Sequence, residues 1–264
     1  MQVFKLGSAV LMCCATMTAQ QIKVPLSSPG QPATVKVSLM NGSIAVTAGA
    51  AGEVVVEASG RAARERADVP TGMHRLDVSS AGVEAREDHN VVSIDGGTYS
   101  GSSNLAIQVP PNCSLQLKSM NGGHIEVTGI NGEIEASNLN GAVALKNVSG
   151  SAVVSSQNGD ITVSMDKVTP NKPMSFTTMN GRIDVTIPGD TKARLRLKTD
   201  HGEVFSDFDV KMEPDTSKPI VEENRGQGGK YRIRMDKNVY GSINGGGPEL
   251  RFETMNGSIL IHKK

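Results

Sequence analysis

The chain has 264 residues, and its 27 Lys and Arg side chains are balanced by 27 Asp and Glu, which gives no formal net charge. This length suffices for one large all-β domain or two small ones without disulfide stapling. The balanced charge argues against a nucleic-acid-binding face, and an aromatic content of 3% with no Trp requires a core of Val, Ile, Leu, Met and Ala.

The first 19 residues have the pattern of a secretory signal peptide. Lys5 precedes the apolar stretch from residue 6 to residue 14, and small residues follow through Ala19. We therefore expect residues 1–19 to be removed and the mature protein to begin near Gln20, in the periplasm or at the cell surface. No later stretch is long and apolar enough to span a bilayer, so we expect no membrane-spanning segment after the leader.

Cysteine usage bears on both anchoring and stability. Cys13 and Cys14 raise the alternative of a lipid anchor, but the residues before them differ from the usual Leu-x-(Ala/Gly)-Cys pattern, which favours ordinary cleavage. Cys113 is then the single cysteine of the mature chain. We expect no internal disulfide, so stability must come from packing and backbone pairing.

Residues 20–110 are predicted to form a β-rich N-terminal cap and the first rungs of a stack. Strand-like runs such as 53–57 and 104–109 support this interpretation. The polar stretch 61–69 fits a helical turn or a loop.

One pattern then dominates the chain: Asn-Gly, a variable residue, an aliphatic, a polar residue and a second aliphatic. Its copies begin at Asn41-Gly42, Asn131-Gly132, Asn140-Gly141, Asn158-Gly159, Asn180-Gly181 and Asn256-Gly257; Asn121-Gly122 carries an extra Gly, and Ser149-Gly150 and His201-Gly202 are variants. Between residues 121 and 158 the turns fall nine or ten residues apart.

Alternating strands on both sides of each turn make the unit a strand, a tight turn and a strand. Asn and Gly tolerate the positive φ that a sharp corner requires. Short strands that cannot bury their apolar faces alone can do so when stacked about 4.8 Å apart. The sequence thus predicts an all-β, parallel β-helix-like solenoid, regular over 111–264 with a flexible insertion at 211–230. A sandwich or meander of Asn-Gly hairpins is the alternative.

Three segments carry a family resemblance over roughly residues 35–262. These are Ile107-Gln-Val-Pro leading into 115–122, Ile183-Asp-Val-Thr-Ile-Pro leading into 195–202, and the closing run 245–257. In this succession the chain resembles exported bacterial proteins with the domain of unknown function 4097, often labelled adhesins. The resemblance implies a β-helix-like fold and a cell-envelope location, and it carries over no catalytic or binding residues.

Two repeated residue types invite a functional interpretation. Met40, Met120, Met179 and Met255 precede the turns and could form a soft-metal site. We expect stacked core residues instead, because Ile130, Leu139 and Val148 take the same place in other copies. The turn asparagines are likewise expected to form a stacked amide ladder and not a ligand site.

Carboxylates beside the turns raise the alternative of a glycan hydrolase or lyase with a paired acid and base. Alternation already places such residues on the solvent face, and the absence of Trp disfavours a sugar-stacking cleft, so we expect no enzyme. The residues concerned are Glu133, Asp160, Asp184 and Glu203.

No metal, cofactor or phosphate site is predicted. The five histidines, at 74, 89, 124, 201 and 262, lack ligand spacing, and neither Asp160 nor 95–97 shows the acidic repeat of a calcium-binding solenoid. The Gly-rich run 245–248 lacks the Lys and helix of a phosphate loop.

The sequence thus favours a non-catalytic, exported cell-envelope repeat protein, acting as an adhesin-like binding or scaffold module for an envelope or extracellular partner. A structural envelope component without a dedicated ligand and, less favoured, a β-helix polysaccharide-active enzyme are the alternatives.

Overall fold

The computed structural model describes residues 20–61, 82–96, 102–214, 220–224, 230–234 and 238–264. Within these ranges every regular element is a strand, which confirms the predicted all-β class. The leader, residues 62–69 of the polar stretch and parts of the predicted insertion lie outside the described residues. The described residues contain no helix that could cross a membrane.

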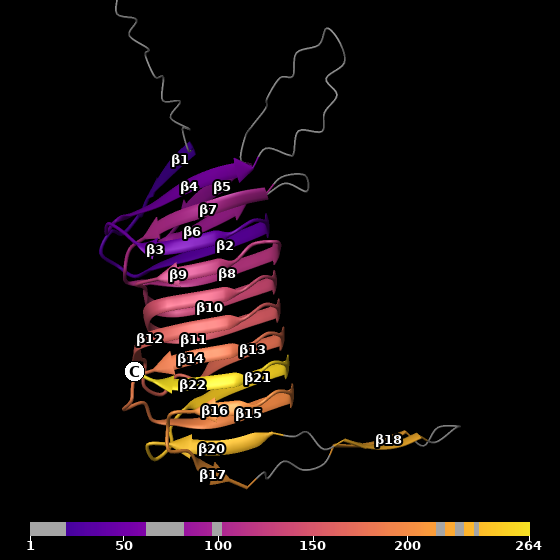
Figure 1. The fold of residues 1–264 in the computed structure, drawn as a ribbon. Coiled ribbons are helices and arrows are strands. Elements are labelled where there is room, and N and C mark those ends of the chain that lie inside the picture. Colours follow the sequence, from indigo (N-terminus) through magenta and orange to yellow (C-terminus); the bar gives the residue numbers. More distant parts are fainter. Residues whose placement is uncertain (1–19, 62–81, 97–101, 215–219, 225–229, 235–237) are drawn as a thin grey trace, which may run out of the picture.

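Two walls of parallel strands face each other across the core (Figure 1). The incoming wall leads into the Asn-Gly turns and consists, in spatial order, of β6 (Val91–Gly96), β2 (Ala33–Asn41), β8 (Cys113–Asn121), β10 (Asn131–Asn140), the second half of β11 (Val143–Asn158), β13 (Met174–Asn180), β21 (Glu249–Asn256) and β15 (Ala193–His201).

The outgoing wall leads away from the turns, and its strands are also parallel. In spatial order it consists of β7 (Ser102–Val109), β3 (Ile44–Ala48), β9 (Ile125–Thr128), the first half of β11, β12 (Ile161–Val168), β14 (Ile183–Ile187), β22 (Ile259–Lys263) and β16 (Val204–Ser206). An incoming strand and the outgoing strand that follows it in the chain make one rung.

The core lies between the walls because alternate residues of each strand point inward. β8, for example, buries Cys113, Leu115, Leu117 and Ser119, whereas Gln116 and Lys118 between them are exposed. The parallel register places like residues above one another, so that aliphatic rows run along the stack. The rings of Phe176 and Phe252, on neighbouring strands, stack with centroids 5.2 Å apart.

Antiparallel strands cover both walls at one end of the stack and the incoming wall at the other end. At one end β1 (Gln20–Pro25) pairs with β4 (Glu53–Arg61), β4 pairs with β7, and β5 (Glu84–Asp88) pairs with β6. At the other end β20 (Val239–Ile243) pairs with β15, and β17 (Lys211–Glu213) pairs with β20. The start of the predicted flexible insertion is therefore a paired strand. β18 (Ile220–Asn224) and β19 (Lys230–Arg234) form a separate antiparallel hairpin.

The rungs do not stack in chain order. The β2–β3 rung lies between β6–β7 and β8–β9, although it precedes both in the sequence. The last rung, β21–β22, drawn in yellow in Figure 1, lies between β13–β14 and β15–β16. The first and last rungs in the sequence, β2–β3 and β21–β22, are thus each held between two other rungs.

The inward aliphatic rows yield a direct test of this packing. Ile183 is fully buried, whereas its neighbour Arg182 is exposed. We expect Ile183→Asp to lower the free energy of unfolding by about 3–5 kcal/mol, because it places an unpaired carboxylate in the core. The matched control Arg182→Ala should change it by about 0.5 kcal/mol or less. Urea titration of both variants is the measurement, and equal midpoints would contradict the assignment of inward and outward residues.

Candidate functional site

Six of the predicted turn asparagines stack at one corner, here called the Asn corner. They are Asn41, Asn121, Asn140, Asn158, Asn180 and Asn256, with His201 in the same place on the β15–β16 rung. Their side-chain amides bond from rung to rung: Asn158 Nδ2 donates to Asn140 Oδ1 (2.9 Å), and Asn180 Nδ2 donates to Asn158 Oδ1 (2.7 Å). Asn256 donates to Asn180 in the same way (2.7 Å).

The glycines of this corner are required by close backbone contact. A Cβ on Gly181 would lie 2.3 Å from the carbonyl oxygen of Gly159, and one on Gly141 would lie 1.8 Å from that of Gly123. Gly181 itself does not have a positive φ, and neither does any turn asparagine, so the expected left-handed corner is wrong at these positions.

The turn after Asn121 shows how the column accommodates an extra residue. Gly123, and not the predicted Gly122, faces the carbonyl oxygen of Gly42. Gly122 has a φ of 74°, and a Cβ there would meet nothing within 4 Å. The extra residue therefore bulges outward while the glycine column continues.

Asn131-Gly132 belongs to the opposite corner, where the chain passes from the outgoing wall to the next incoming strand. Asn131 Nδ2 donates to Asn112 Oδ1 (2.9 Å), and a Cβ on Gly132 would lie 2.1 Å from the carbonyl oxygen of Cys113. Gly150 stacks on Gly132 in turn. Treating all the turns as equivalent was wrong: turns nine or ten residues apart alternate between two corners.

A row of buried polar side chains, which the sequence analysis missed, lies behind the Asn corner. Two residues before five of the turn asparagines, and before His201, a hydroxyl or amide donates to the glycine carbonyl oxygen of the neighbouring rung. The bonds run from Ser119 to Gly42 (3.3 Å), Asn138 to Gly123 (2.9 Å), Ser156 to Gly141 (3.1 Å), Thr178 to Gly159 (3.0 Å), Thr254 to Gly181 (3.0 Å) and Thr199 to Gly257 (2.9 Å). The Ser, Thr and Asn at this inward position were its sequence signal.

The methionines before the turns lie on the outer surface, which overturns the expected core role. Met120, Met179 and Met255 are 49%, 44% and 45% exposed, and Met40 is half-buried. Leu139 shares their place and is also exposed. Ile130 and Val148, which suggested a core position, are buried because they precede turns at the opposite corner.

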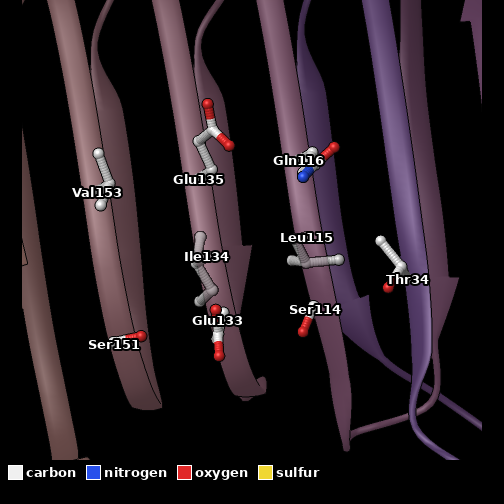
Figure 2. Close-up of a pocket in the computed structure, with 9 residues that line it drawn as sticks. All are labelled: Thr34, Ser114, Leu115, Gln116, Glu133, Ile134, Glu135, Ser151 and Val153. Carbon is white, nitrogen blue, oxygen red and sulfur yellow. The ribbon is translucent and has the colours of Figure 1, made fainter. Parts of the chain in front are cut away.

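The outer face of the incoming wall carries a shallow, open hollow of about 520 Å³, shown in Figure 2. Outward side chains of β2, β8, β10 and β11 line it, among them Glu133, Glu135, Gln116 and the exposed Val153. Because the strands are in register, these side chains lie in straight rows across neighbouring rungs.

The structure does not assemble the predicted carboxylates into one site. Glu133 forms an ion pair with Lys172, Asp160 Oδ1 accepts the backbone N–H of Arg182 (2.8 Å), and Asp184 lies 3.7 Å from His262 Nε2. The described residues hold no group of three or more His, Cys, Asp or Glu side chains placed to bind a metal. His74 lies outside the described residues.

Two titratable groups illustrate the local electrostatics. A hydrogen bond from His262 Nδ1 (2.9 Å) lowers the pKa of Asp207. Burial raises the pKa of the Cys113 thiol to about 12. That thiol stays protonated at neutral pH, so it is a packing residue and not a nucleophile.

The chain is similar to one family of known proteins and to one solved structure. The profile of a family described as Toastrack DUF4097 matches residues 20–244. A solved structure of a "putative cell adhesion protein" from Clostridium sporogenes is similar, with a TM-score of 0.41 and 12% sequence identity over 94% of this chain and 100% of that chain. No curated protein matches the chain significantly.

The glycine column can be tested with a pair of alanine substitutions. Gly181→Ala should lower the free energy of unfolding by about 2 kcal/mol or more, because the new Cβ collides with a backbone oxygen that cannot move without its rung. Gly122→Ala meets open space and should cost about 1 kcal/mol from its positive φ. Chemical denaturation measures both, and the reverse ranking would rule out steric contact as the requirement.

The buried polar row is tested by removing one hydroxyl. Thr178→Val keeps the side-chain shape but leaves the carbonyl oxygen of Gly159 without its donor, so we expect a loss of about 1–2 kcal/mol. Thr177→Val, one residue earlier and pointing outward, is the control and should change stability by about 0.5 kcal/mol or less. Thermal unfolding followed by circular dichroism separates them; a loss no larger for Thr178→Val than for the control would refute the row's role.

Proposed function

The chain belongs to the Toastrack DUF4097 family, and from this premise we propose that it is a β-solenoid that acts as a non-catalytic binding module of the cell envelope. The partner is an envelope or extracellular component that lies along the outer face of the incoming wall. The signal-peptide pattern of residues 1–19 supports export.

The observation that carries this proposal is the outer face itself. Parallel strands in uniform register present their outward side chains as straight rows, about 4.8 Å apart from rung to rung. Such a flat, extended surface suits an extended partner that makes many similar contacts, as concave or flat faces of other repeat proteins do.

The same face changes in chemistry along the stack. Glu133 and Glu135 lie in the hollow on its first half, whereas strands of its second half carry Arg196 and a cluster in which Lys198 and Arg251 pair with Glu253. A partner that spans several rungs would meet both regions, which gives direction and selectivity to its binding.

Two carboxyl groups outside the predicted set have lowered pKa values and are poor general acids at neutral pH. A general acid at neutral pH needs a raised pKa. Hydrogen bonds from Ser27 lower the pKa of Glu87. Partial burial raises the pKa of Glu253, but the hydrogen bond and charge of Arg251 outweigh it and lower the pKa overall. Both groups are therefore suited to ion pairing.

The test compares two arginine substitutions on the two walls. Val153 is exposed in the hollow of the incoming wall, and Thr162 is exposed on the outgoing wall of the same rung. We expect Val153→Arg to weaken retention of the purified protein on isolated cell envelopes by about tenfold, because a long charged side chain obstructs the face. Thr162→Arg should bind like the wild type. Sedimentation with envelopes at fixed ionic strength is the measurement.

Two outcomes would contradict the proposal. If both variants are retained equally, the outer face of the incoming wall is not the binding surface. If the wild type shortens envelope polysaccharide during the incubation, the protein is an enzyme.

A further inference from the structure

We propose that two pairs of surface methionines, Met40 with Met120 and Met179 with Met255, each bind one soft monovalent cation, Cu(I) or Ag(I), through their thioether sulfur atoms. This inference is separate from the binding role of the outer face and does not rest on it.

The register of the incoming wall brings each pair together. Asn41 stacks on Asn121, and Asn180 stacks on Asn256, so the methionine immediately before each asparagine lies beside that of the neighbouring strand. Parallel neighbours are about 4.8 Å apart, and a methionine side chain has three rotatable bonds. Two sulfur atoms can therefore converge on one ion with no change in the backbone.

Each pair lies at a hollow that also contains carboxylates. Met40 and Met120 line a hollow of about 250 Å³ with Glu84 and Asp95. Met179 and Met255 line another, of about 360 Å³, with Asp200 and Glu253.

One carboxylate at each hollow keeps its charge, because Glu84 pairs with Arg86, and Glu253 pairs with Arg251 and with Lys198, which lines the second hollow. Among the described residues, neither Asp95 nor Asp200 has an ion-pair partner. An uncompensated carboxylate favours a cation in the same hollow and can supply an oxygen ligand in addition to the two thioethers.

The fold gives no reason for methionine at this position. Three of the four side chains are exposed and that of Met40 is half-buried, so they do not fill the core, and Leu139, Gln157 and Asp200 occupy the same place on other rungs. Four of the 12 methionines in the chain nevertheless occur here, as two adjacent pairs. Thioethers select soft ions, whereas Ca²⁺ and Mg²⁺ prefer oxygen ligands, so the chemistry points to Cu(I) or Ag(I).

Silver(I) is the probe, because it needs no reductant. The mature chain, which begins at Gln20, carries Cys113→Ala so that no thiol competes, and its methionine methyl groups are labelled with ¹³C. Titration in chloride-free buffer should load about two silver ions per chain. The methyl resonances of the four paired methionines should shift together, while that of the exposed Met212 should not shift at the same silver concentration.

A double substitution separates the two sites. Met179→Leu with Met255→Leu keeps the apolar volume and should halve the bound silver while leaving the shifts of Met40 and Met120 intact. Met212→Leu is the matched control and should leave the bound silver unchanged. The proposal is overturned if no silver binds, if the double variant binds as much as the parent, or if the resonance of Met212 shifts in parallel with the pairs.

Discussion

The close approach of neighbouring turns at the Asn corner is the constraint on which the rest of the structure depends. A Cβ on the glycine at the turn would lie 1.8 Å from the next backbone at Gly141 and 2.3 Å at Gly181, so only glycine lets the rungs come together there. Once the backbones meet at this distance, the registers of both walls are fixed. The amide ladder outside the corner, the buried polar row behind it and the aliphatic rows of the core are consequences of that register.

The interleaved terminal rungs change how such a stack holds together. In a simple repeat array the last rung has one neighbour, and the array frays from its ends. Here β2–β3 and β21–β22 each contact a rung on both sides, and antiparallel strands cover the walls beyond β6, β7 and β15. The exposed edges that invite aggregation are thereby reduced. This arrangement joins residues far apart in sequence, which raises the entropic cost of closing the intervening loops during folding.

The sequence predicted the local unit well and its placement less well. Alternation and Asn-Gly turns were sufficient for an all-β stack of short strands. They did not distinguish the two corners, because both half-rungs have similar lengths and the same alternation. Ile130 and Met120 look equivalent in sequence, yet Ile130 is buried and Met120 is exposed. The rung order was also beyond reach, because β13, β15 and β21 end in the same pattern, a threonine followed two residues later by the turn residue, so either of the last two strands could pair with β13.

Because backbone contacts and buried rows set the stacking, the outward positions are left free to carry function. One outward row of the incoming wall passes through Lys118, Ser137, Ser155, Thr177 and Glu253 with no change in strand geometry. A position that tolerates such variety imposes no structural choice of its own. Methionine recurs in the next outward row, where polar and acidic residues fit equally well. Its recurrence is therefore better explained by what these side chains contact outside the protein than by packing within it.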